Sequence, residues 1–347
     1  MTSSALSHAG LDLRPYRPEM ASGMIDAWNA ACGDHFPLSE ALFRQNTAED
    51  PHFDPAGCWV AWDPGDRGVR GFCVAKVAAE PLGADGLLED RGWISMIAVH
   101  PAVQRRGIGT ALLRKAEEFL RGRGRSRAIL GGDPGHFFPG VPAETARGPA
   151  GGSGAVPADG PAPAFFTASG YRLRGEAYDL RRSLGAYRTP SRVRAAAAAQ
   201  TDLDVRPLRR GEEPALLAFL DAVFPGRWRY TLGRFLAGGG EIGDVMGVVR
   251  RGSVLGFAHL FHPASRWIGP SIAWARHRAQ AGGLGPMGLA PALRGHGLGL
   301  VILDGSVRHL ARLGVEDMVI DWTVLLDFYG RLGFVPWKRY RHGERAL

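Results

Sequence analysis

Two short glycine motifs have the residue types and spacing of anion-binding loops. The first is Gln104-Arg105-Arg106-Gly107-Ile108-Gly109, and the second is Arg294-Gly295-His296-Gly297-Leu298-Gly299. Each follows an apolar stretch typical of a strand and opens an amphipathic stretch typical of a helix. The first N–H groups of a helix lack intrahelical partners, and the helix dipole adds positive potential there. Both motifs therefore predict phosphate-binding helix starts in which glycine lets the backbone approach the anion.

Other phosphate-binding motifs fit these residues less well. A P-loop ends in Gly-Lys-Ser/Thr, which neither motif contains. A dinucleotide fingerprint needs a third small residue, but Leu112 and Ile302 occupy those positions. The remaining interpretations are a site for the pyrophosphate of coenzyme A and a glycine-rich helix start that binds nothing. Two copies in matching contexts favour the pyrophosphate site.

The motifs belong to a longer internal repeat. Residues 12–17 (DLRPYR) are echoed by residues 204–209 (DVRPLR), and residues 69–72 (VRGF) by residues 254–257 (VLGF). After the motifs, Gly170-Tyr171 is echoed by Gly333-Phe334. The earlier matches occur in the same order at nearly constant separation, which indicates two copies of one domain. The last match breaks this separation because the first copy carries an insertion.

The repeats predict the domain boundaries. We expect an N-terminal domain at residues 11–182, a linker at 183–203 and a C-terminal domain at 204–347. The first copy is longer because of a Gly/Pro/Ala-rich insertion near residues 139–163, which we expect to be a mobile loop since it offers few large apolar side chains. Five consecutive alanines within residues 191–200 predict a helical linker.

Hydrophobic periodicity predicts an α+β fold in which each copy has a mixed, mainly antiparallel sheet flanked by helices. In the first copy we expect strands at 11–15, 57–62, 69–77, 93–99 and 128–131, and helices at 19–31, 107–120 and 164–169. In the second copy we expect helices at 298–313 and 325–332, and strands at 318–322 and from 335 onward.

The amino-acid composition favours some classes of binding partner and excludes others. The formal net charge of +8 favours anionic partners such as coenzyme A or an acyl carrier protein. We expect no nucleic-acid partner because no basic helix or zinc finger is evident. Without an apolar run long enough to span a bilayer, or a secretory leader, we expect no membrane partner and a cytoplasmic protein. The three cysteines lack paired spacing, so we expect no metal.

The sequence resembles the GNAT superfamily of acyl-CoA N-acyltransferases, and in particular tandem, double-GNAT bacterial proteins. Residues 97–101 (IAVHP) and 287–291 (MGLAP), each followed by its glycine motif, resemble the family's central strand and cofactor loop. Phe328-Tyr329 with Gly333-Phe334 resembles its late Tyr-x-x-x-Gly-Phe element. The resemblance covers nearly the whole chain apart from the linker and the insertion.

The resemblance implies how acetyl-CoA, or another acyl-CoA, is bound and used. The acyl-pantetheine would lie between the central strand and the next one, against backbone at Ile97, Ala98 and Val99 or at Met287, Gly288 and Leu289. A backbone N–H there would polarise the thioester carbonyl. Tyr329 matches the family's tyrosine acid, which protonates the departing thiolate. The first copy has Phe166 at that position and cannot donate a proton.

The general base is less evident. Many family members carry a glutamate where this chain has Ser95 in the first copy and Gly285 in the second. Asp321 is a candidate base beside the second site, with a structural cap or turn as its alternative role. His259 and His262 could also face the cleft, or be ordinary strand residues.

We therefore expect an N-acetyltransferase that acts on the primary amine of a small molecule or peptide by direct attack, with catalysis in the second copy. The alternatives are a protein that only binds or senses acyl-CoA, and acyl transfer from a carrier protein.

Overall fold

The N-terminal half of the computed structural model begins with strands and two helices before its motif helix. The structure describes residues 7–8, 10–131, 134, 141–145, 161–275 and 280–347. The elements of this half are β1 (Ser7–His8), β2 (Leu11–Pro15), α1 (Ala21–Cys32), α2 (Glu40–Gln45), β3 (Cys58–Asp63), β4 (Gly68–Lys76), β5 (Arg91–Val99), α3 (Ile108–Gly122), β6 (Arg127–Leu130), β7 (Val141–Thr145), α4 (Pro161–Ala168), β8 (Arg172–Ser183) and the linker helix α5 (Ser191–Ala198).

The C-terminal half repeats the same order. Its elements are β9 (Asp204–Pro207), α6 (Glu213–Val223), α7 (Arg227–Ala237), β10 (Val245–Arg250), β11 (Ser253–Phe261), α8 (Pro270–Ala273), β12 (Ala281–Leu289), α9 (Leu298–Arg312), β13 (Asp317–Thr323), α10 (Leu326–Gly330) and β14 (Val335–Ala346). The register confirms the repeat: Gly71 pairs with Val99 across β4 and β5, and Gly256 pairs with Leu289 across β11 and β12.

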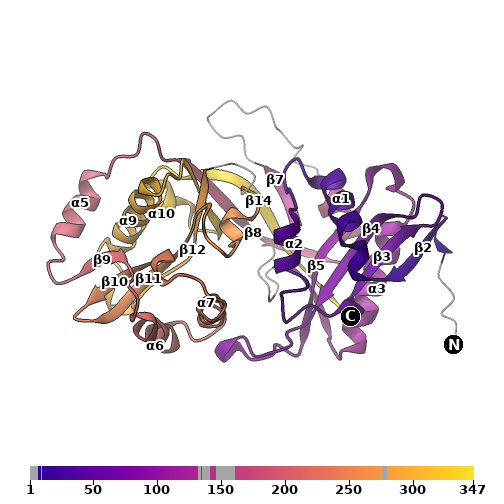
Figure 1. The fold of residues 1–347 in the computed structure, drawn as a ribbon, viewed down its shortest axis with the longest axis horizontal. Helices are drawn as coiled ribbons and strands as arrows, with labels where there is room; N and C mark the ends of the chain where they lie inside the picture. Colours follow the sequence, from indigo (N-terminus) through magenta and orange to yellow (C-terminus); the bar gives the residue numbers. More distant parts are fainter. Residues whose placement is uncertain (1–6, 9, 132–133, 135–140, 146–160, 276–279) are drawn as a thin grey trace.

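The two halves exchange their last strands. β14, at the end of the second copy, pairs with β6 of the first, while β8, at the end of the first copy, pairs with β13 of the second. β8 and β14 also pair with each other, so both copies merge into one 14-stranded sheet. Figure 1 shows these two strands crossing the middle of the molecule, with the second copy on the left and the first on the right. The last strand of each sequence repeat thus lies in the sheet of the other half.

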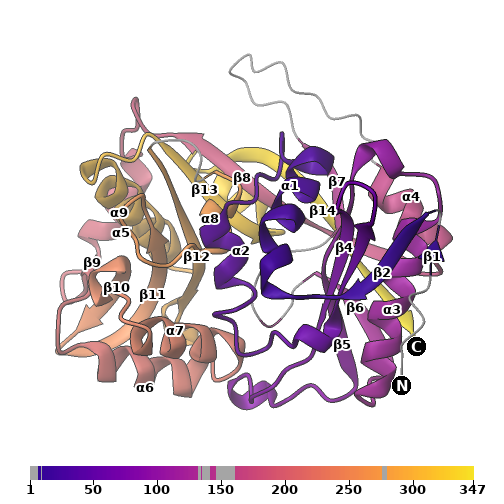
Figure 2. The same ribbon diagram turned by 45° about the vertical axis from the view of Figure 1, so that its right-hand side comes forward.

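Alternation along the strands places core residues on both faces of each half-sheet. In the first half, Phe72 and Val74 pack with α1 and α2, whereas Cys73 and Ala75 pack with α3. In the second half, one face packs on α6 and α7 and the other on α9. The first of these cores continues between the halves, because Trp274 and Tyr340 of the second copy belong to the cluster of α1 and α2. In Figure 2, α1 and α2 lie between the two halves.

The structure confirms most expected elements to within a few residues, including the helical linker, now α5. The insertion differs from expectation in one part: residues 141–145 form β7, which pairs with β14 and is therefore not an unstructured loop. The exposed edge that β14 offers explains this pairing, since unpaired strand edges recruit extended segments. The expected mobility at residues 146–160 falls outside the described residues.

Two further observations concern the described part of the chain only. None of its helices is long and apolar enough to cross a membrane. No group of three or more His, Cys, Asp or Glu side chains within it is arranged to hold a metal ion.

Candidate active site

Each half-sheet opens into a V between its two parallel strands. In the first half, the parallel pairing of β5 with β6 ends at Ile94 and Leu130. In the second half, the pairing of β12 with β13 ends at Leu284 and Ile320. Beyond these points β5 and β12 continue only with their antiparallel neighbours. Polar groups on the diverging edges are then free to contact a ligand that lies along the strand.

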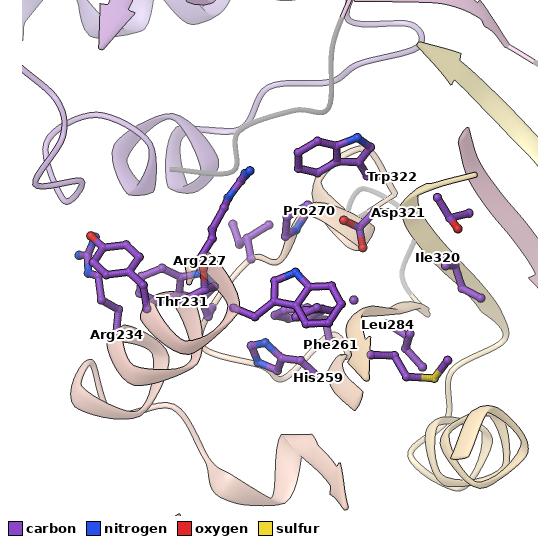
Figure 3. Close-up of a pocket in the computed structure, with 18 of the residues that line it drawn as sticks. Arg227, Thr231, Arg234, His259, Phe261, Pro270, Leu284, Ile320, Asp321 and Trp322 are labelled. Atoms are coloured by element: carbon purple, nitrogen blue, oxygen red, sulfur yellow. The ribbon is translucent and has the colours of Figure 1, made fainter. Parts of the chain in front are cut away.

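A cavity of about 420 Å³ lies at the opening of the second V. Its walls come from β11, β12, β13, α7 and α10 of the second copy and from α2 of the first. The lining includes Gln45, Glu49, Asp50, Arg227, Trp228, Tyr230, Arg234, His259, Trp267, Met287, Asp321, Trp322 and Tyr329. The N-terminal half therefore closes a cavity whose centre belongs to the C-terminal half (Figure 3).

Asp321 enters this cavity at the point where the V opens. It follows Ile320, the last residue of β13 that pairs with β12, and Figure 3 shows its carboxylate directed into the cavity. A Cβ atom built on Gly285 would overlap Asp321 Oδ1. Asp321 lies on the neighbouring strand and thus occupies the space that a side chain at residue 285 would fill. Residue 285 is the position at which many GNAT proteins carry a glutamate and this chain has glycine.

The surroundings of Asp321 suit a proton acceptor. Its Oδ1 atom is buried and has no hydrogen-bond partner among the described residues. Burial, with the nearby charge of Asp179 as a second cause, raises the pKa of Asp321 to about 7. Arg227 acts in the opposite sense. A carboxyl group with a pKa near neutrality can both accept and release a proton at working pH.

Tyr329 lies on α10 and lines the same cavity. Its side chain is buried, with 7% exposed, and packs edge-on against Phe328 and Phe334. Burial and the charge of Asp321 raise the pKa of Tyr329 above its ordinary value. The phenol is therefore protonated near neutral pH, as a proton donor must be.

The first V lacks both groups. Gly131 follows Leu130 as Asp321 follows Ile320, so glycine stands at the position of the carboxylate. Phe166 is buried in the core of α3, α4 and the adjoining strands. Ser95, at the position equivalent to Gly285, is buried, and its Oγ has no partner among the described residues. Neither a proton acceptor nor a tyrosine donor is present at these positions.

The surroundings of His259 and His262 argue against either of them as the proton acceptor. His259 lines the cavity but lies between Phe235 and Phe261, with ring centroids 4.3 and 4.2 Å away. Burial lowers its pKa to about 3, so it is a poor proton acceptor. His262 lies just beyond the end of β11, where its Nε2 contacts Asp244 Oδ1 at 3.0 Å.

Contacts between the halves hold the cavity wall in place. Gln45 of α2 makes two 2.9 Å hydrogen bonds with the backbone of Ile268. The N–H of Ala79 donates to His52 Nδ1, so His52 Nε2 carries the ring proton and donates to the Tyr230 hydroxyl at 2.7 Å. Tyr230 in turn donates to Glu80 Oε1 at 2.5 Å. These bonds fix α7, which carries Tyr230, against the first copy.

Sequence reasoning missed the cavity residues of α7, of α2 and of the loop after α2. Arg227 stacks over Trp322 with its guanidinium carbon 4.9 Å from the ring centroid, and Asp50 forms a buried ion pair with Lys76 at 2.6 Å. Asp50 of the first half also lies 3.9 Å from Arg234 of α7 in the second half. The sequence held no signal for such a meeting, because it forms only when the two halves pack together.

The two glycine motifs adopt matching loops. Arg105 and Gly107 in the first, and Gly295 and Gly297 in the second, have left-handed backbone with φ of 61°, 80°, 83° and 79°. Alternating left-handed residues before a helix form a concave array of N–H groups that suits an anion. This geometry favours the expected cofactor role for residues 104–109 and 294–299.

Four residues of the motifs, Gln104, Gly109, Arg294 and Gly299, make contacts that shape the loop or the packing of its helix. Gln104 Nε2 donates to the carbonyl of Val99 at 2.8 Å, and Arg294 donates twice to the carbonyl of Leu289 at 3.1 Å. Both side chains therefore tie the loop to its strand. A Cβ on Gly109 or Gly299 would lie 3.3 Å from Phe165 or 3.1 Å from Phe328, so these glycines also allow close helix packing.

The remaining expected cofactor residues divide between strand and helix. Ile97, Ala98 and Val99 lie in β5, and Met287, Gly288 and Leu289 lie in β12, each just before a loop. Arg106 and His296 are in the loops, whereas Ile108 and Leu298 begin α3 and α9 with buried side chains. Only Met287 among them lines the cavity.

Two V-shaped half-sheets, each with a glycine loop and a motif helix, are the arrangement of tandem GNAT proteins, which this chain resembles in fold. Residues 24–136 match the family model described as the acetyltransferase (GNAT) family. The chain is similar to the mycothiol acetyltransferase of Rhodococcus erythropolis, with 35% identity over 126 residues, which are 35% of this chain and 40% of that relative. It is also similar to the mycothiol acetyltransferase of Renibacterium salmoninarum, with 28% identity over 35% of each chain. These matches span less than half of each relative's length.

Solved structures support the fold over the whole chain. The GCN5-related glucosamine N-acetyltransferase region of a fungal multi-domain GH3 beta-N-acetylglucosaminidase superposes with a TM-score of 0.82 at 24% identity, covering 99% of this chain and 39% of that one. A tandem GNAT protein from the clavulanic acid biosynthesis pathway superposes with a TM-score of 0.62 at 17% identity, covering 97% and 98%. Similarity at these identities concerns the fold.

Proposed function

We propose that this chain is an acetyl-CoA-dependent N-acetyltransferase whose chemistry takes place in the C-terminal half. The observation that carries the proposal is that Asp321 and Tyr329 line one cavity at the opening of the second V. One is a carboxyl group with a pKa near neutrality and the other is a protonated phenol. The equivalent positions of the first half hold Gly131 and Phe166.

The proposed reaction is a direct transfer in which the acceptor amine attacks the acetyl thioester. A C–N bond forms and the C–S bond breaks. Asp321 accepts the proton that the amine loses, and Tyr329 donates a proton to the departing sulfur. Backbone at Met287–Leu289, on the diverging edge of β12, would hold the pantetheine arm. The loop at residues 294–299 would hold the pyrophosphate.

The cavity supports a small, ring-bearing acceptor with hydroxyl groups, and we propose an amino sugar. Trp228, Tyr230, Trp267 and Trp322 contribute aromatic faces, with Arg227 and Glu49 as polar groups. Aromatic rings can pack against the apolar C–H face of a polyhydroxylated ring, while polar side chains of the lining can form hydrogen bonds with its hydroxyl groups. The names of the similar proteins point the same way, because one is a glucosamine N-acetyltransferase region.

The N-terminal half supports a different, non-catalytic use of acyl-CoA. Its loop has the left-handed residues Arg105 and Gly107, as the second loop has Gly295 and Gly297. It lacks the proton acceptor and the proton donor. We propose that this half binds acyl-CoA without turning it over and serves mainly to complete the acceptor cavity.

The test is acetyl transfer by the purified full chain. Acetyl-CoA is incubated with glucosamine, with other primary amines and with peptides, and the products are identified by mass spectrometry. We expect the unmodified chain to form N-acetylglucosamine from glucosamine. The Asp321→Asn variant should retain only a small fraction of this activity. Consumption of acetyl-CoA without an amide product, or turnover that survives in Asp321→Asn, would overturn the proposal.

A further inference from the structure

The exchanged strand β8 brings a second buried carboxyl group to the back of the C-terminal site. Asp179 is 2% exposed. One of its oxygens, Oδ1, accepts a hydrogen bond from the backbone N–H of Trp322 at 3.2 Å. The other, Oδ2, accepts a hydrogen bond from the hydroxyl of Tyr340 on β14 at 2.6 Å. Trp322 is the residue directly after Asp321.

The first of these bonds lies inside a bulge of β13. Ile320 pairs with Leu180 and Thr323 pairs with Tyr178, so Asp321 and Trp322 together face the single residue Asp179. Trp322 is also a non-glycine residue in the left-handed region, with φ of 42°. Bulges redirect side chains and are common beside active sites. The extra residue leaves one backbone N–H, that of Trp322, outside the strand ladder, and the Asp179 side chain accepts a hydrogen bond from it.

We propose that Asp179 is a positioning residue for Asp321: the first repeat supplies it to the active site of the second, where it holds the bulge that directs the Asp321 carboxylate toward Gly285. The proposal rests on the proposed role of Asp321 as proton acceptor. It explains why the site in the C-terminal half depends on a strand from the N-terminal half.

The same placement couples the two carboxyl groups electrostatically. Burial raises the pKa of Asp179 to about 6, while its hydrogen bonds and the charge of Lys338 act against the rise. The negative charge of Asp179 is the second cause of the raised pKa of Asp321, after burial.

Other charged and titratable groups lie around the pair on each neighbouring element. Arg227 on α7 lowers the pKa of Asp321. Tyr329 on α10 and Tyr340 on β14 both have raised pKa values and are neutral near pH 7. His342 on β14 lies 3.4 Å from the Trp322 ring nitrogen, and burial lowers its pKa. Asp179 is therefore the one acid besides Asp321 that titrates near neutrality within this described group.

The first repeat lacks this arrangement as well. Its β6 faces β14, where Gly343 pairs with Leu130 as Leu180 pairs with Ile320. By this register, His342 stands where Asp179 stands in the second repeat. The carboxyl pair thus occurs only at the V that also carries Tyr329.

The test separates the charge of Asp179 from its shape. Asp179→Asn keeps an oxygen that can accept the hydrogen bond from the Trp322 N–H. Because a neutral acceptor replaces a charged one at unchanged geometry, we expect kcat at high pH to stay within about threefold of that of the unmodified chain. Removing a like charge lowers the pKa of Asp321, so the acidic limb of kcat/KM moves to lower pH. Asp179→Ala loses the bulge bond, and its kcat at high pH falls by about tenfold or more, as expected for a misplaced catalytic group.

Asp304→Asn is the matched control. Asp304 is also 2% exposed and accepts a 2.6 Å hydrogen bond from a tyrosine hydroxyl, that of Tyr187, but it lies on α9. We expect its pH profile to match that of the unmodified chain. An acidic limb that Asp179→Asn leaves in place, or full kcat in Asp179→Ala, overturns the proposal.

A second measurement does not need turnover. Thermal melting from pH 5 to 9 is compared for the unmodified chain, Asp179→Asn, Asp321→Asn and the double variant. Coupled carboxyl groups predict that Asp321→Asn changes the pH dependence less when Asp179 is already replaced. Independent effects at every pH would contradict the coupling. A chain that acetylates no amine but shows the coupling would refute the proposed function alone.

Discussion

Asp321 fills the space that a side chain on Gly285 would need. A Cβ atom at residue 285 would overlap Asp321 Oδ1, although the two residues lie on different strands, β12 and β13. In the first half the sizes are reversed, with Ser95 at the position of Gly285 and Gly131 at that of Asp321. At this pair of positions each V therefore has one polar side chain, and only that of the second V is a carboxylate.

This relationship predicts the effect of adding a single methyl group. Gly285→Ala should displace the Asp321 carboxylate and lower kcat by about a hundredfold, since small displacements of a catalytic group have effects of this size. The melting temperature should also fall because of overpacking. The double variant Gly285→Ala with Asp321→Gly removes the overlap but not the strain of a side chain at φ 157°, so it should recover part of the stability without activity. Steady-state kinetics and thermal melting check both, and normal kcat in Gly285→Ala would show that Asp321 lies elsewhere during catalysis.

Tyr329→Phe should lower kcat by about 10²–10⁴, the usual contribution of positioned acid catalysis. The acetyl-CoA dissociation constant should stay nearly unchanged, because the hydroxyl acts on the departing sulfur. Phe166→Ala in the first half is the contrasting variant, which should cost about 3–5 kcal/mol of stability as a truncated buried ring and leave the chemical step intact. Unchanged turnover in Tyr329→Phe, together with a large loss in a variant of the first loop, would place catalysis in the N-terminal half.

Phosphate binding by the two glycine loops can be tested separately by adding a negative charge at one left-handed residue of each loop. Gly297→Asn and Gly297→Asp share their shape, and both residue types tolerate left-handed backbone. The aspartate adds a negative charge where a phosphate is expected, so acetyl-CoA should bind at least about tenfold more weakly than to the asparagine variant, or about 1.4 kcal/mol. The same pair at Gly107 probes the first loop by isothermal titration. Equal affinities within a pair would mean that its loop binds no phosphate.

Asp321→Asn should stabilise the fold increasingly as the pH rises from 5 to 8. The pKa of the folded carboxyl group is raised to about 7, so above its ordinary value of about 3.9 ionisation costs the folded state more than the unfolded state. That cost is absent at low pH, grows between these two values and is complete above pH 7. Asparagine carries no such charge. Thermal melting across this range measures the difference, and a constant difference at all pH values would contradict the raised pKa.

Local sequence signals were sufficient for the repeated elements and the loops. The spacing around Gly107 and Gly297 specifies a left-handed residue directly before a helix, and the alternation in β3, β4, β10 and β11 specifies half-buried strands. These features depend on backbone preference and side-chain periodicity, which act within a few residues. The tyrosine of α10 could be placed for the same reason, because it lies a fixed distance from Gly333 in a short helix and turn.

Only the tertiary structure decided which copy each final strand joins and which side chains meet at the cavity. β8 and β14 have similar patterns, and each could pair with either half-sheet, so their exchange depends on packing between the halves rather than on local periodicity. The closeness of Asp321 to Gly285 and of Asp179 to Trp322 follows from strand register and from a bulge. Contacts between residues far apart in the chain leave no periodic trace in the sequence, because they are determined by the packing of whole elements.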